Sequence, residues 1–506
     1  MGEIVNTNRF SVKTLPTYDL AIIGGGVNGT AIARDAAGRG YSVILLEQGD
    51  LASATSSSST KLIHGGLRYL EYGELLLVKK ALAEREVFLK SAPHIVWPMR
   101  FVLPLPEKSR AAWKIQLGLS LYDHLARRDV LPASERIRNS EHDFCKPLFG
   151  NLRACFAYSD CWVDDARMVI LQALDAGRNG AEIWPRTGVR DITPVDGGWE
   201  IETETDRRVA ARMVINATGP WVRQLLEKNG LTQPNTPKLR LVRGSHIVVP
   251  AIYEGDQSYL LQQPDGRIVF AIPYEGKFTL IGTTDVDHAG GPEVPPVCTS
   301  DEAEYLCDAV NRYFEKQILP RDAIWNYSGV RPLFDDGHGK AAAVTRDYHL
   351  HSATHAGAPI LSIYGGKITT ARVLAEAAML EIEDVLGRKA GPWTMHATLP
   401  GGDLVEGDFP EFVGDMAARF HWLDSDTLLR YARAYGSWML RILGDATHVS
   451  HLGRDFGGGL YEAEVEYLRV VEWARNADDI LWRRSKLGLH VSPETVAALK
   501  RYMGNT

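Results

Sequence analysis

The chain is poor in cysteine and has no long hydrophobic run. Its five cysteines are scattered and form no Cys-x-x-Cys pair, so they give no metal-binding signature and suit a reducing compartment. No run of about 18 apolar residues is present, so no transmembrane helix is expected. The first residues lack the basic and apolar stretches of a secretory signal. We therefore expect the protein to stay on the cytoplasmic side.

Cations are not in excess either. The 56 Lys and Arg residues against 63 Asp and Glu give a net charge of −7, which argues against general nucleic-acid binding. Hydrophobic residues make up 45% and charged residues 24% of the chain, as in folded globular proteins. A chain of 506 residues is too long for one hydrophobic core, so we expect two to four domains.

The N-terminal part carries a nucleotide-binding pattern. An apolar strand is expected over residues 19–23, followed by glycines spaced Gly-x-Gly-x-x-Gly and then by a helix. Gly24 permits a tight turn, Gly26 lets the backbone approach a pyrophosphate, and Gly29 lets helix and strand pack closely. A second strand ends at Glu47, about 20 residues later, where a carboxylate can bind ribose hydroxyls. This order of elements predicts a dinucleotide site at a helix N-terminus.

The glycine motif alone leaves FAD and NAD open, while the acid at the strand end disfavours NADP. Three further segments favour FAD. Residues 48–66, "QGDLASATSSSSTKLIHGG", have small hydroxyls and no helical period, which suits a second contact with a pyrophosphate. The segment "RMVINATGPWV" (212–222) ends a strand in small residues that let a loop approach the cofactor. Residues 358–380 repeat strand, Gly-Gly and helix, with Lys367 at a helix N-terminus suited to a reduced flavin's anion.

Together these motifs resemble the FAD-dependent, quinone-linked sn-glycerol-3-phosphate dehydrogenases of the aerobic type, within the D-amino-acid-oxidase-like superfamily. The resemblance spans nearly the whole chain. The N-terminal "IGGGVNGTAIARDAAGRG" is shared with many amine and hydroxy-acid oxidases. The combination of "KLIHGGLRYLE", "GSHIVV", "GTTD" and "SGVRPL" is more specific to glycerol phosphate.

The expected fold class is α/β (α+β), with a Rossmann-like FAD-binding domain, an antiparallel-sheet substrate domain and a C-terminal helical domain. Residues 236–329 show the period-two alternation of an antiparallel sheet. The predicted FAD-binding domain is discontinuous and the molecule is expected to be a homodimer. The predicted domains are 17–92, 155–235 and 330–388 for FAD, 93–154 and 236–329 for substrate, and 389–506 for the helical domain.

The resemblance implies that the Ser-rich segment wraps FAD, while residues 61–69 run under the isoalloxazine into the substrate pocket. No metal is predicted, because the aspartates of "YSDCWVDDARMV" (158–169) have no His or Glu to complete a site. The predicted FAD contacts are Gly24, Gly26, Asn28, Gly29, Glu47, Ser53, Thr55, Ser56, Ser57, Lys61, His64, Val189, Ala217, Gly219, Gly366, Lys367, Ile368 and Thr369.

A phosphate monoester requires fixed cations, and the planar guanidinium of arginine suits two-point contact. Arg68, Arg331 and Arg346 follow or precede expected strand ends and are the candidates, and the resemblance favours Arg331 most. The reaction it implies is oxidation of sn-glycerol 3-phosphate to dihydroxyacetone phosphate, with the C2 hydride passing to N5 of FAD.

A base must take the C2 hydroxyl proton, and a pKa near the working pH points to histidine. The resemblance favours His64 over His246, and the choice stays open. It implies that His246, Thr284 and Tyr69 hold the glycerol hydroxyls. It makes Arg331 a residue for binding and polarising the substrate, two roles that the sequence does not separate. The predicted catalytic residues are His64, His246, Arg331 and Lys367.

The resemblance implies one of two electron acceptors: membrane quinone if the protein is a dehydrogenase, or O₂ if it is an oxidase. Within residues 97–128 cations outnumber anions, as in helices that lie on anionic membranes. The alternative is a helix packed on the protein through Ile115 and Leu119. The resemblance favours peripheral or monotopic attachment to the cytoplasmic face of the cytoplasmic membrane. The proposed contact face comprises Trp113, Leu117, Leu121 and Leu125.

Other functions are kept as alternatives. The nearest are a glycerol-3-phosphate oxidase and a related FAD-dependent amine or hydroxy-acid oxidoreductase. From other classes come an NAD dehydrogenase and a non-catalytic flavin-bound scaffold. The last domain offers no catalytic constellation, and simple packing is favoured there over dimer or partner contact. Its conspicuous residues are Trp473, Trp482, Arg483 and Arg484.

Overall fold

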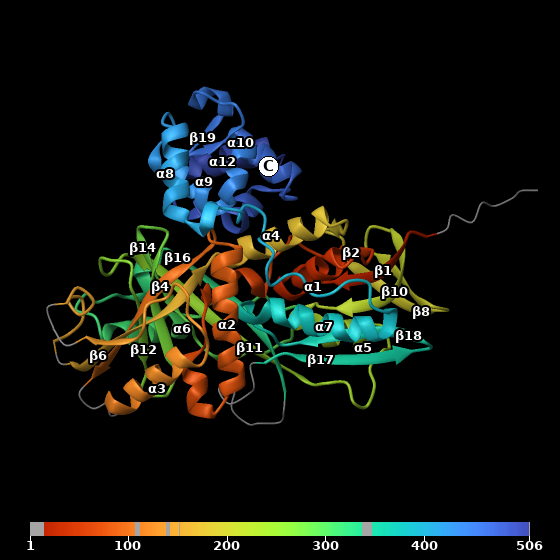
Figure 1. The fold of residues 1–506 in the computed structure, drawn as a ribbon, viewed down its shortest axis with the longest axis horizontal. Coiled ribbons are helices and arrows are strands. Elements are labelled where there is room, and N and C mark those ends of the chain that lie inside the picture. Colours follow the sequence, from red (N-terminus) through yellow and green to blue (C-terminus); the bar gives the residue numbers. More distant parts are fainter. Residues whose placement is uncertain (1–14, 107–111, 138–141, 151, 336–346, 505–506) are drawn as a thin grey trace, which may run out of the picture.

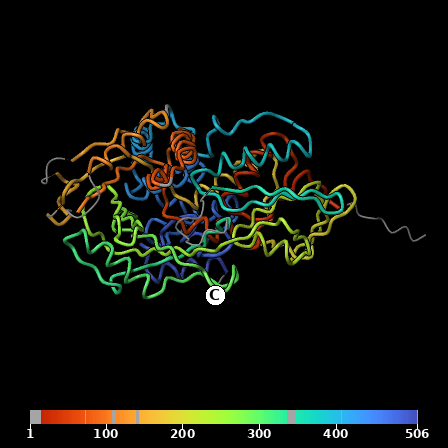
Figure 2. The backbone as a smooth tube through the Cα atoms, turned by 90° about the horizontal axis from the view of Figure 1, so that it is seen from below, coloured from red at the N-terminus to blue at the C-terminus, as the bar shows by residue number. Residues whose placement is uncertain are grey.

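Two β-sheets lie side by side along the long axis of the molecule, and a helical C-terminal lobe contacts both (Figure 1). The computed structural model describes residues 15–106, 112–137, 142–150, 152–335 and 347–504. Viewed from below, N-terminal, central and later segments of the chain run together in one half of the molecule (Figure 2). One layer is therefore built from widely separated parts of the sequence.

Sheet A has the order β17-β18-β10-β1-β2-β7, and β9 and β8 extend it from β10. β18, β10, β1, β2 and β7 are parallel, whereas β17 is antiparallel to β18. The described strands are β1 (Thr17–Ile23), β2 (Val43–Leu46), β7 (Glu182–Trp184), β8 (Val189–Val195), β9 (Gly198–Thr203), β10 (Arg208–Asn216), β17 (His349–His355) and β18 (Ala358–Tyr364).

Both faces of sheet A are covered, which explains why β1 is apolar at nearly every position. Leu20 and Ile22 belong to the buried cluster beneath the helices, while Ala21 and Ile23 belong to a cluster on the opposite face. The opposite face is covered by the β8–β9 hairpin and by α5 (Val222–Lys228). The helices on the first face are α1 (Val27–Gly38), α4 (Asp165–Arg178) and α7 (Ala371–Leu386).

Sheet B is mostly antiparallel and has the order β15-β11-β14-β13-β12-β4-β6-β3, with β16 beside β11 and β5 beside β6. Its alternation is visible in β11, where Ile247 and Val249 face one cluster and Val248 faces another. The described strands are β3 (Leu62–Ile63), β4 (Val96–Pro106), β5 (Glu135–Ile137), β6 (Leu152–Val163), β11 (Leu239–Pro250), β12 (Ser258–Gln262), β13 (Ile268–Tyr274), β14 (Phe278–Gly282), β15 (Val286–Asp287) and β16 (Trp325–Phe334).

Helices cover both faces of sheet B. α6 (Ser300–Asn311) contributes Leu306 and Val310 to the cluster that contains Ile247. α2 (Leu75–Ser91) and α3 (Ala112–His124) contribute to the cluster that contains Val248. A short helical segment, η2 (Leu67–Tyr72), packs against α2 and α3 on this same side.

The C-terminal lobe is mainly helical, with one small hairpin. Its apolar residues, such as Leu428 and Leu468, belong to the same buried cluster as α1, α4 and α7. The lobe therefore shares a core with sheet A and is not held by a linker alone. Its described elements are α8 (Phe409–Arg419), α9 (Ser425–Tyr435), α10 (Met439–Leu443), β19 (Asp455–Gly457), β20 (Leu460–Tyr461), α11 (Glu462–Val470), the π-helical η10 (Asp479–Arg484) and α12 (Pro493–Tyr502).

The domain boundaries stay predictions, but strand pairing departs from them at two places. Most of β6 lies in a segment predicted for the FAD-binding domain, yet β6 pairs with β4 in sheet B. β16 pairs with β11 in sheet B along its whole length, including residues 330–334. β6 is an apolar strand that leads directly into α4, which is the strand–helix pattern expected for sheet A. The pattern alone does not reveal which sheet the strand joins.

Candidate functional site

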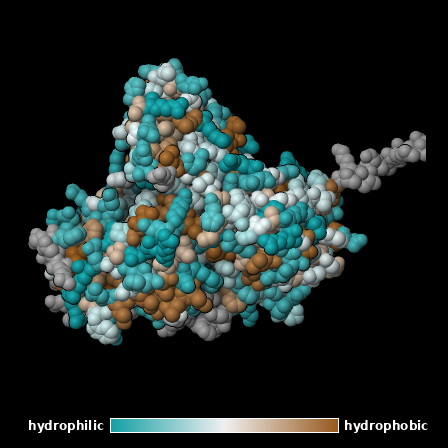
Figure 3. Space-filling view, viewed as in Figure 1, coloured by the Kyte–Doolittle hydropathy of each residue, from teal (hydrophilic) through white to brown (hydrophobic). Residues whose placement is uncertain are grey.

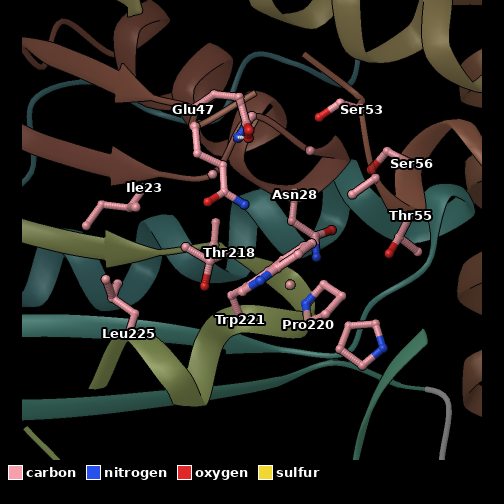
Figure 4. A pocket seen from close by; sticks show the side chains of 18 of the residues that line it. Ile23, Asn28, Glu47, Ser53, Thr55, Ser56, Thr218, Pro220, Trp221 and Leu225 are labelled. Atoms are coloured by element: carbon pink, nitrogen blue, oxygen red, sulfur yellow. Dashed lines mark hydrogen bonds between the residues drawn. The ribbon is translucent and has the colours of Figure 1, made fainter. Parts of the chain in front are cut away.

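A cavity of about 460 Å³ opens at the carboxyl ends of β1, β2 and β10. Figure 4 shows Glu47 on one side, Thr218 and Trp221 on the other, and Ser53, Thr55 and Ser56 beside Asn28. Ligands of open parallel sheets bind at such strand ends. The lining residues that the sequence also predicts as FAD contacts are Gly24, Gly26, Asn28, Glu47, Ser53, Thr55, Ser56, Val189, Ala217, Gly219 and Gly366.

Two glycines of the first motif are required by close backbone contacts. Gly24 has φ +114°, and a Cβ there would lie 2.4 Å from the carbonyl oxygen of Ala217. A Cβ at Gly29 would lie 1.9 Å from the carbonyl oxygen of Gly24. Gly29 does not line the cavity, and its place is the contact between α1 and the β1 turn, as close helix–strand packing requires.

Glu47 is fixed by two backbone groups at the end of β2. The N–H groups of Gly25 and Gly49 donate to its carboxylate at 2.6 and 2.7 Å. Burial raises the pKa of Glu47, while these two hydrogen bonds favour its anion. The carboxylate thus ties the glycine turn to the loop that follows β2.

The Ser-rich segment is ordered by hydrogen bonds and is not a solvated linker. The Thr55 hydroxyl donates to the carbonyl of Val330 at 2.7 Å, and Ser56 Oγ accepts from the N–H of Val27 at 2.9 Å. Ser57 belongs to the same turn but does not line the cavity. The segment therefore joins the start of α1 to β16.

Lys61 is buried away from the cavity. Its ammonium donates to Asp165 at 2.7 Å and to the carbonyl of Ser57 at 3.2 Å, and its side chain is 1% exposed. Ser59 also donates to Asp165 through its hydroxyl at 2.7 Å. Lys61 and Asp165 thus hold the Ser-rich segment from behind, and a direct contact of Lys61 with FAD stays a prediction.

The segment after β18 brings predicted residues from distant parts of the chain together. The Lys367 ammonium lies 3.9 Å from the centroid of the Tyr69 ring. The N–H of His64 donates to Thr369 Oγ1 at 3.4 Å, and the His64 ring meets Phe270 edge-on at 6.4 Å. Of the predicted set, Lys367, Ile368 and Thr369 do not line the cavity but continue from Gly366, which does. Arg68 lies in η2 beside Tyr69.

Beneath His64 lies a buried network that the sequence did not predict. The Gly65 N–H donates to Tyr122 Oη at 2.9 Å, and Tyr122 donates to Asp160 at 2.8 Å. Arg85 pairs with Asp160 at 2.9 Å. Burial raises the pKa of Asp160 to about 6, although Arg85 opposes this shift. The network fixes the loop on which His64 sits.

Arg331 lies on β16 and is paired with Asp285 at 2.6 Å. It also donates to Thr283 Oγ1 at 3.0 Å, and its side chain is 25% exposed. A Cβ at Gly244 would lie 2.6 Å from the Arg331 guanidinium, which explains the glycine of "RGSH". Arg331 is thus a positioned cation that remains reachable by a ligand.

Thr284 and His246 are both buried and already have contacts within the protein, although they were predicted to hold the substrate's hydroxyls. Thr284 is buried and donates to Glu302 at 2.7 Å while accepting from the Ser245 N–H. His246 is buried, stacks on Tyr327 at 4.7 Å and has Nε2 3.0 Å from Thr60 Oγ1. Burial, then the charges of Arg331 and Lys61, hold the pKa of His246 well below its ordinary value. Arg346 lies outside the described residues.

Several lining residues were missed by the sequence analysis. Pro220 and Trp221 follow the "NATG" turn, and Gln224 and Lys228 follow on α5. Their position in the sequence could have revealed them, because they come directly after a strand end that was already predicted to approach the cofactor. Asp160 and Tyr122 carried no such signal, since they lie far apart in the sequence and meet only in the fold.

A protein-family model described as FAD dependent oxidoreductase matches residues 19–372. The chain belongs to this FAD-dependent oxidoreductase family. Within this family, the chain is 47% identical to a glycerol-3-phosphate dehydrogenase of Pseudomonas aeruginosa, across 97% of this chain and 96% of that protein. It is also 45% identical to a D-erythritol 1-phosphate dehydrogenase of Brucella abortus, across 97% and 98%.

Two solved structures share the fold. A Bacillus halodurans glycerol-3-phosphate dehydrogenase complexed with FAD superimposes with a TM-score of 0.75 at 27% identity, covering 98% of this chain and 92% of that one. An L-alpha-glycerophosphate oxidase of Mycoplasma pneumoniae superimposes with a TM-score of 0.60 at 19% identity, covering 76% of this chain and 100% of that one. This second likeness supports the fold alone.

The cofactor of this family is FAD, and the cavity fits it. Small residues from three segments, Gly24, Ala217 and Gly366, line it and leave room for a pyrophosphate. The buried oxygens Asn28 Oδ1 and Gln224 Oε1, both on lining residues, have no hydrogen-bond partner within the described residues. Buried polar atoms are normally paired, so these two mark polar positions for a ligand.

Proposed function

We propose that the protein oxidises sn-glycerol 3-phosphate at C2, giving dihydroxyacetone phosphate, and passes the electrons to a membrane quinone. The observation that carries this proposal is the 47% identity to a glycerol-3-phosphate dehydrogenase across 97% of this chain. The positioned, partly exposed Arg331 supports it further, because arginine suits two-point contact with a phosphate.

Bound FAD supplies the acceptor for the C2 hydride. Arg331 is proposed to exchange part of its contact with Asp285 for the substrate phosphate, so the cation is in place before binding. His64 is the proposed base, because its backbone is fixed through Gly65 and the residue is only partly buried. His246 is proposed to act by positioning, since its Nε2 is engaged with Thr60. Lys367 and Tyr69 form the remaining wall of the proposed substrate site.

The base assignment is tested by the pH profile of kcat/KM. His64→Asn is expected to lower kcat about 10²- to 10⁴-fold and to abolish the acid limb of the profile. His246→Asn, which removes a ring that stays neutral, is expected to keep that limb. The assignment is wrong if the limb disappears only with His246→Asn.

A four-carbon substrate is the second candidate. The identity to the D-erythritol 1-phosphate dehydrogenase, 45% across 97% of this chain, is almost as high as that to the glycerol-3-phosphate dehydrogenase. Both substrates are polyol phosphates with a secondary hydroxyl, so the same cation and base serve either. Comparing kcat/KM for the two compounds distinguishes the candidates.

The proposed quinone acceptor requires contact with a membrane. α3 exposes Trp113 and Leu117, each 64% exposed, and Leu121, while Leu119 and Tyr122 are buried. Leu76 at the start of α2 is 77% exposed. Hydrophobic surface gathers along the lower edge of the molecule, where these two helices lie (Figure 3). Such a patch with Lys79, Lys80 and Lys114 nearby suits an anionic membrane surface.

Details of α3 differ from the sequence pattern. Leu125, predicted on the exposed face, follows the helix and packs against a buried cluster. Ile115 and Leu119 also pack inward, so α3 has one packed face and one exposed apolar face. Among the described residues no helix is long and apolar enough to span a bilayer. Peripheral attachment at the cytoplasmic face and a homodimer remain part of the proposal.

The test is anaerobic visible spectroscopy of the purified protein. Bleaching of the flavin by sn-glycerol 3-phosphate, with glycerol and amino acids as controls, is the expected result. Reoxidation by a quinone analogue faster than by O₂ supports the dehydrogenase, whereas peroxide release at the same rate identifies an oxidase. A yellow protein that none of these polyol phosphates bleaches overturns the proposed substrate.

A further inference from the structure

The C-terminal lobe contacts the loop that follows β2 through a short segment, η10 (Asp479–Arg484, "DILWRR"). In Figure 1 the lobe lies next to α4, above the region where the two halves of the molecule meet. π-Helical turns are rare and are often found at functional sites. Trp482, Arg483 and Arg484 of this segment have no place in the catalytic chemistry proposed above.

Arg484 and Arg483 both bind Asp50, which lies in the loop that follows β2. Arg484 donates to the two carboxylate oxygens of Asp50 at 2.5 and 2.9 Å, and both side chains are almost wholly buried. Arg483 donates to Asp50 at 2.6 Å. Burial alone would raise the pKa of Asp50, but Arg484 and then Arg483 hold it below its ordinary value. Asp50 is therefore a buried anion with cations from the C-terminal lobe.

The loop that carries Asp50 also forms a wall of the FAD cavity. Gln48, Ala52 and Ser53, on either side of Asp50, line that cavity. The Ser53 N–H donates to the carbonyl of Asp50 at 3.1 Å, and the neighbouring Gly49 donates to Glu47. A displacement of Asp50 is thus transmitted to both Glu47 and Ser53.

Two further contacts hold η10 itself in register. Asp479 accepts two hydrogen bonds from Arg186 at 2.7 and 2.8 Å. Trp482 stacks on Trp325 of β16 at 4.7 Å. Arg186 donates its backbone N–H to Gly49 at 2.8 Å, so it contacts the same loop. The segment is fastened on sheet A and sheet B at once.

We propose that Arg484, assisted by Arg483, is a positioning residue for FAD: the C-terminal lobe holds the β2 loop in its cofactor-binding shape through Asp50. The lobe thereby contributes to cofactor affinity without contacting FAD. This inference depends on FAD binding alone and is independent of which polyol phosphate is oxidised.

The test measures the FAD dissociation constant of full-length apoprotein by titration. Arg484→Met is expected to raise this constant about tenfold or more and to alter the visible circular dichroism of the bound flavin. Arg484→Lys, which keeps a cation beside Asp50, is expected to recover part of the affinity. Arg483→Gln, at a partly exposed position, is expected to give a smaller loss and serves if Arg484→Met does not fold.

Arg430→Met is the matched control, because Arg430 forms a comparable ion pair with Glu464 inside the C-terminal lobe. It is expected to lower the melting temperature of the apoprotein while leaving FAD affinity within about twofold. The proposal is overturned if folded Arg484→Met and Arg483→Gln proteins bind FAD as tightly as the unaltered protein. It is equally overturned if Arg430→Met weakens FAD binding as much as Arg484→Met, since both would then act through general stability.

Discussion

Arg331 is held in place by Asp285 at 2.6 Å, with Thr283 as a further acceptor. A cation fixed in this way loses little freedom when a phosphate arrives, and bidentate geometry adds specificity. The pairing also means that the unliganded site does not leave a half-buried charge uncompensated.

Replacing Arg331 by Met is therefore expected to lower kcat/KM for the polyol phosphate about 10²- to 10³-fold, because two charge-assisted hydrogen bonds are lost. Steady-state kinetics checks this, and a rise in KM alone indicates a role confined to binding. Arg240→Met is the matched control, because Arg240 lies on the neighbouring β11 and forms an ion pair with Asp287 at the surface. An Arg331→Met protein within threefold of the parent would remove Arg331 from the site.

Asp160 links stability to pH. Its pKa is raised from an ordinary value of 3.8 to about 6, so the folded chain binds a proton at this group more readily than the unfolded chain does. Between about pH 4 and 6 the contribution of Asp160 to the free energy of unfolding therefore falls as pH rises. Above pH 6 the carboxylate is charged and this contribution no longer changes.

Asp160→Asn is expected to remove that slope, which amounts to roughly 3 kcal/mol over the interval for a shift of about two pKa units. Above about pH 6 it also leaves Arg85 buried without its anion. Urea unfolding at several pH values between about 4 and 8 measures the slope. An unchanged slope in Asp160→Asn would show that Asp160 does not titrate in this range.

At the scale of elements, α3 has a packed face and an exposed apolar face, which its sequence pattern did not distinguish. Its inner face carries Tyr122 to the loop of His64, while its outer face exposes Trp113 and Leu117. The sequence placed apolar residues on nearly all sides of this helix, which is compatible with either burial or membrane contact.

The variant Trp113→Ser with Leu117→Ser is expected to weaken binding to vesicles containing anionic lipid by tenfold or more, since exposed apolar area is lost. Activity with a water-soluble acceptor is expected to stay unchanged. Vesicle co-sedimentation provides the measurement. Val470→Ser is the control, because Val470 is 78% exposed on the C-terminal lobe. If Val470→Ser weakens vesicle binding as much as the α3 variant does, binding depends on exposed hydrophobic residues in general and not on α3.

At the scale of the whole molecule, the C-terminal lobe and the layer of α1, α4 and α7 share one buried cluster. A buried pair of Arg167 on α4 with Glu472 adds a charged contact between them at 2.9 Å. Elements that share a core unfold together, so the lobe is not expected to behave as an independent domain.

We therefore expect one thermal transition, with flavin release and loss of helix at the same temperature. Free FAD at about 100 times its dissociation constant adds about 2.7 kcal/mol to the free energy of unfolding. Because the unfolding entropy of a chain this long is large, this is expected to raise that temperature by only about 2–3 °C. Calorimetry with simultaneous flavin fluorescence checks both points. Two separate transitions would instead make the lobe a separate folding unit.

The sequence by itself determined the local chemistry of the cofactor site. Gly24, Gly29 and Glu47 were assigned from spacing, since a turn, a close contact and a carboxylate at a strand end are properties of short segments. The family was likewise accessible, because its motifs are distributed along the chain. The apolar run of β1 and the alternation of β11 also predicted their kinds of sheet.

Only the tertiary structure decided which distant residues meet. Asp160 with Tyr122, Lys61 with Asp165, and Arg484 with Asp50 are buried ion or hydrogen-bond pairs whose partners are far apart in the sequence. Each member looks like an ordinary surface charge or aromatic until the fold removes it from water. Burial makes such a group costly without a partner, and therefore fixes the loop that carries it. Local pattern contains no information on that pairing, because the pairing is a property of the packed chain.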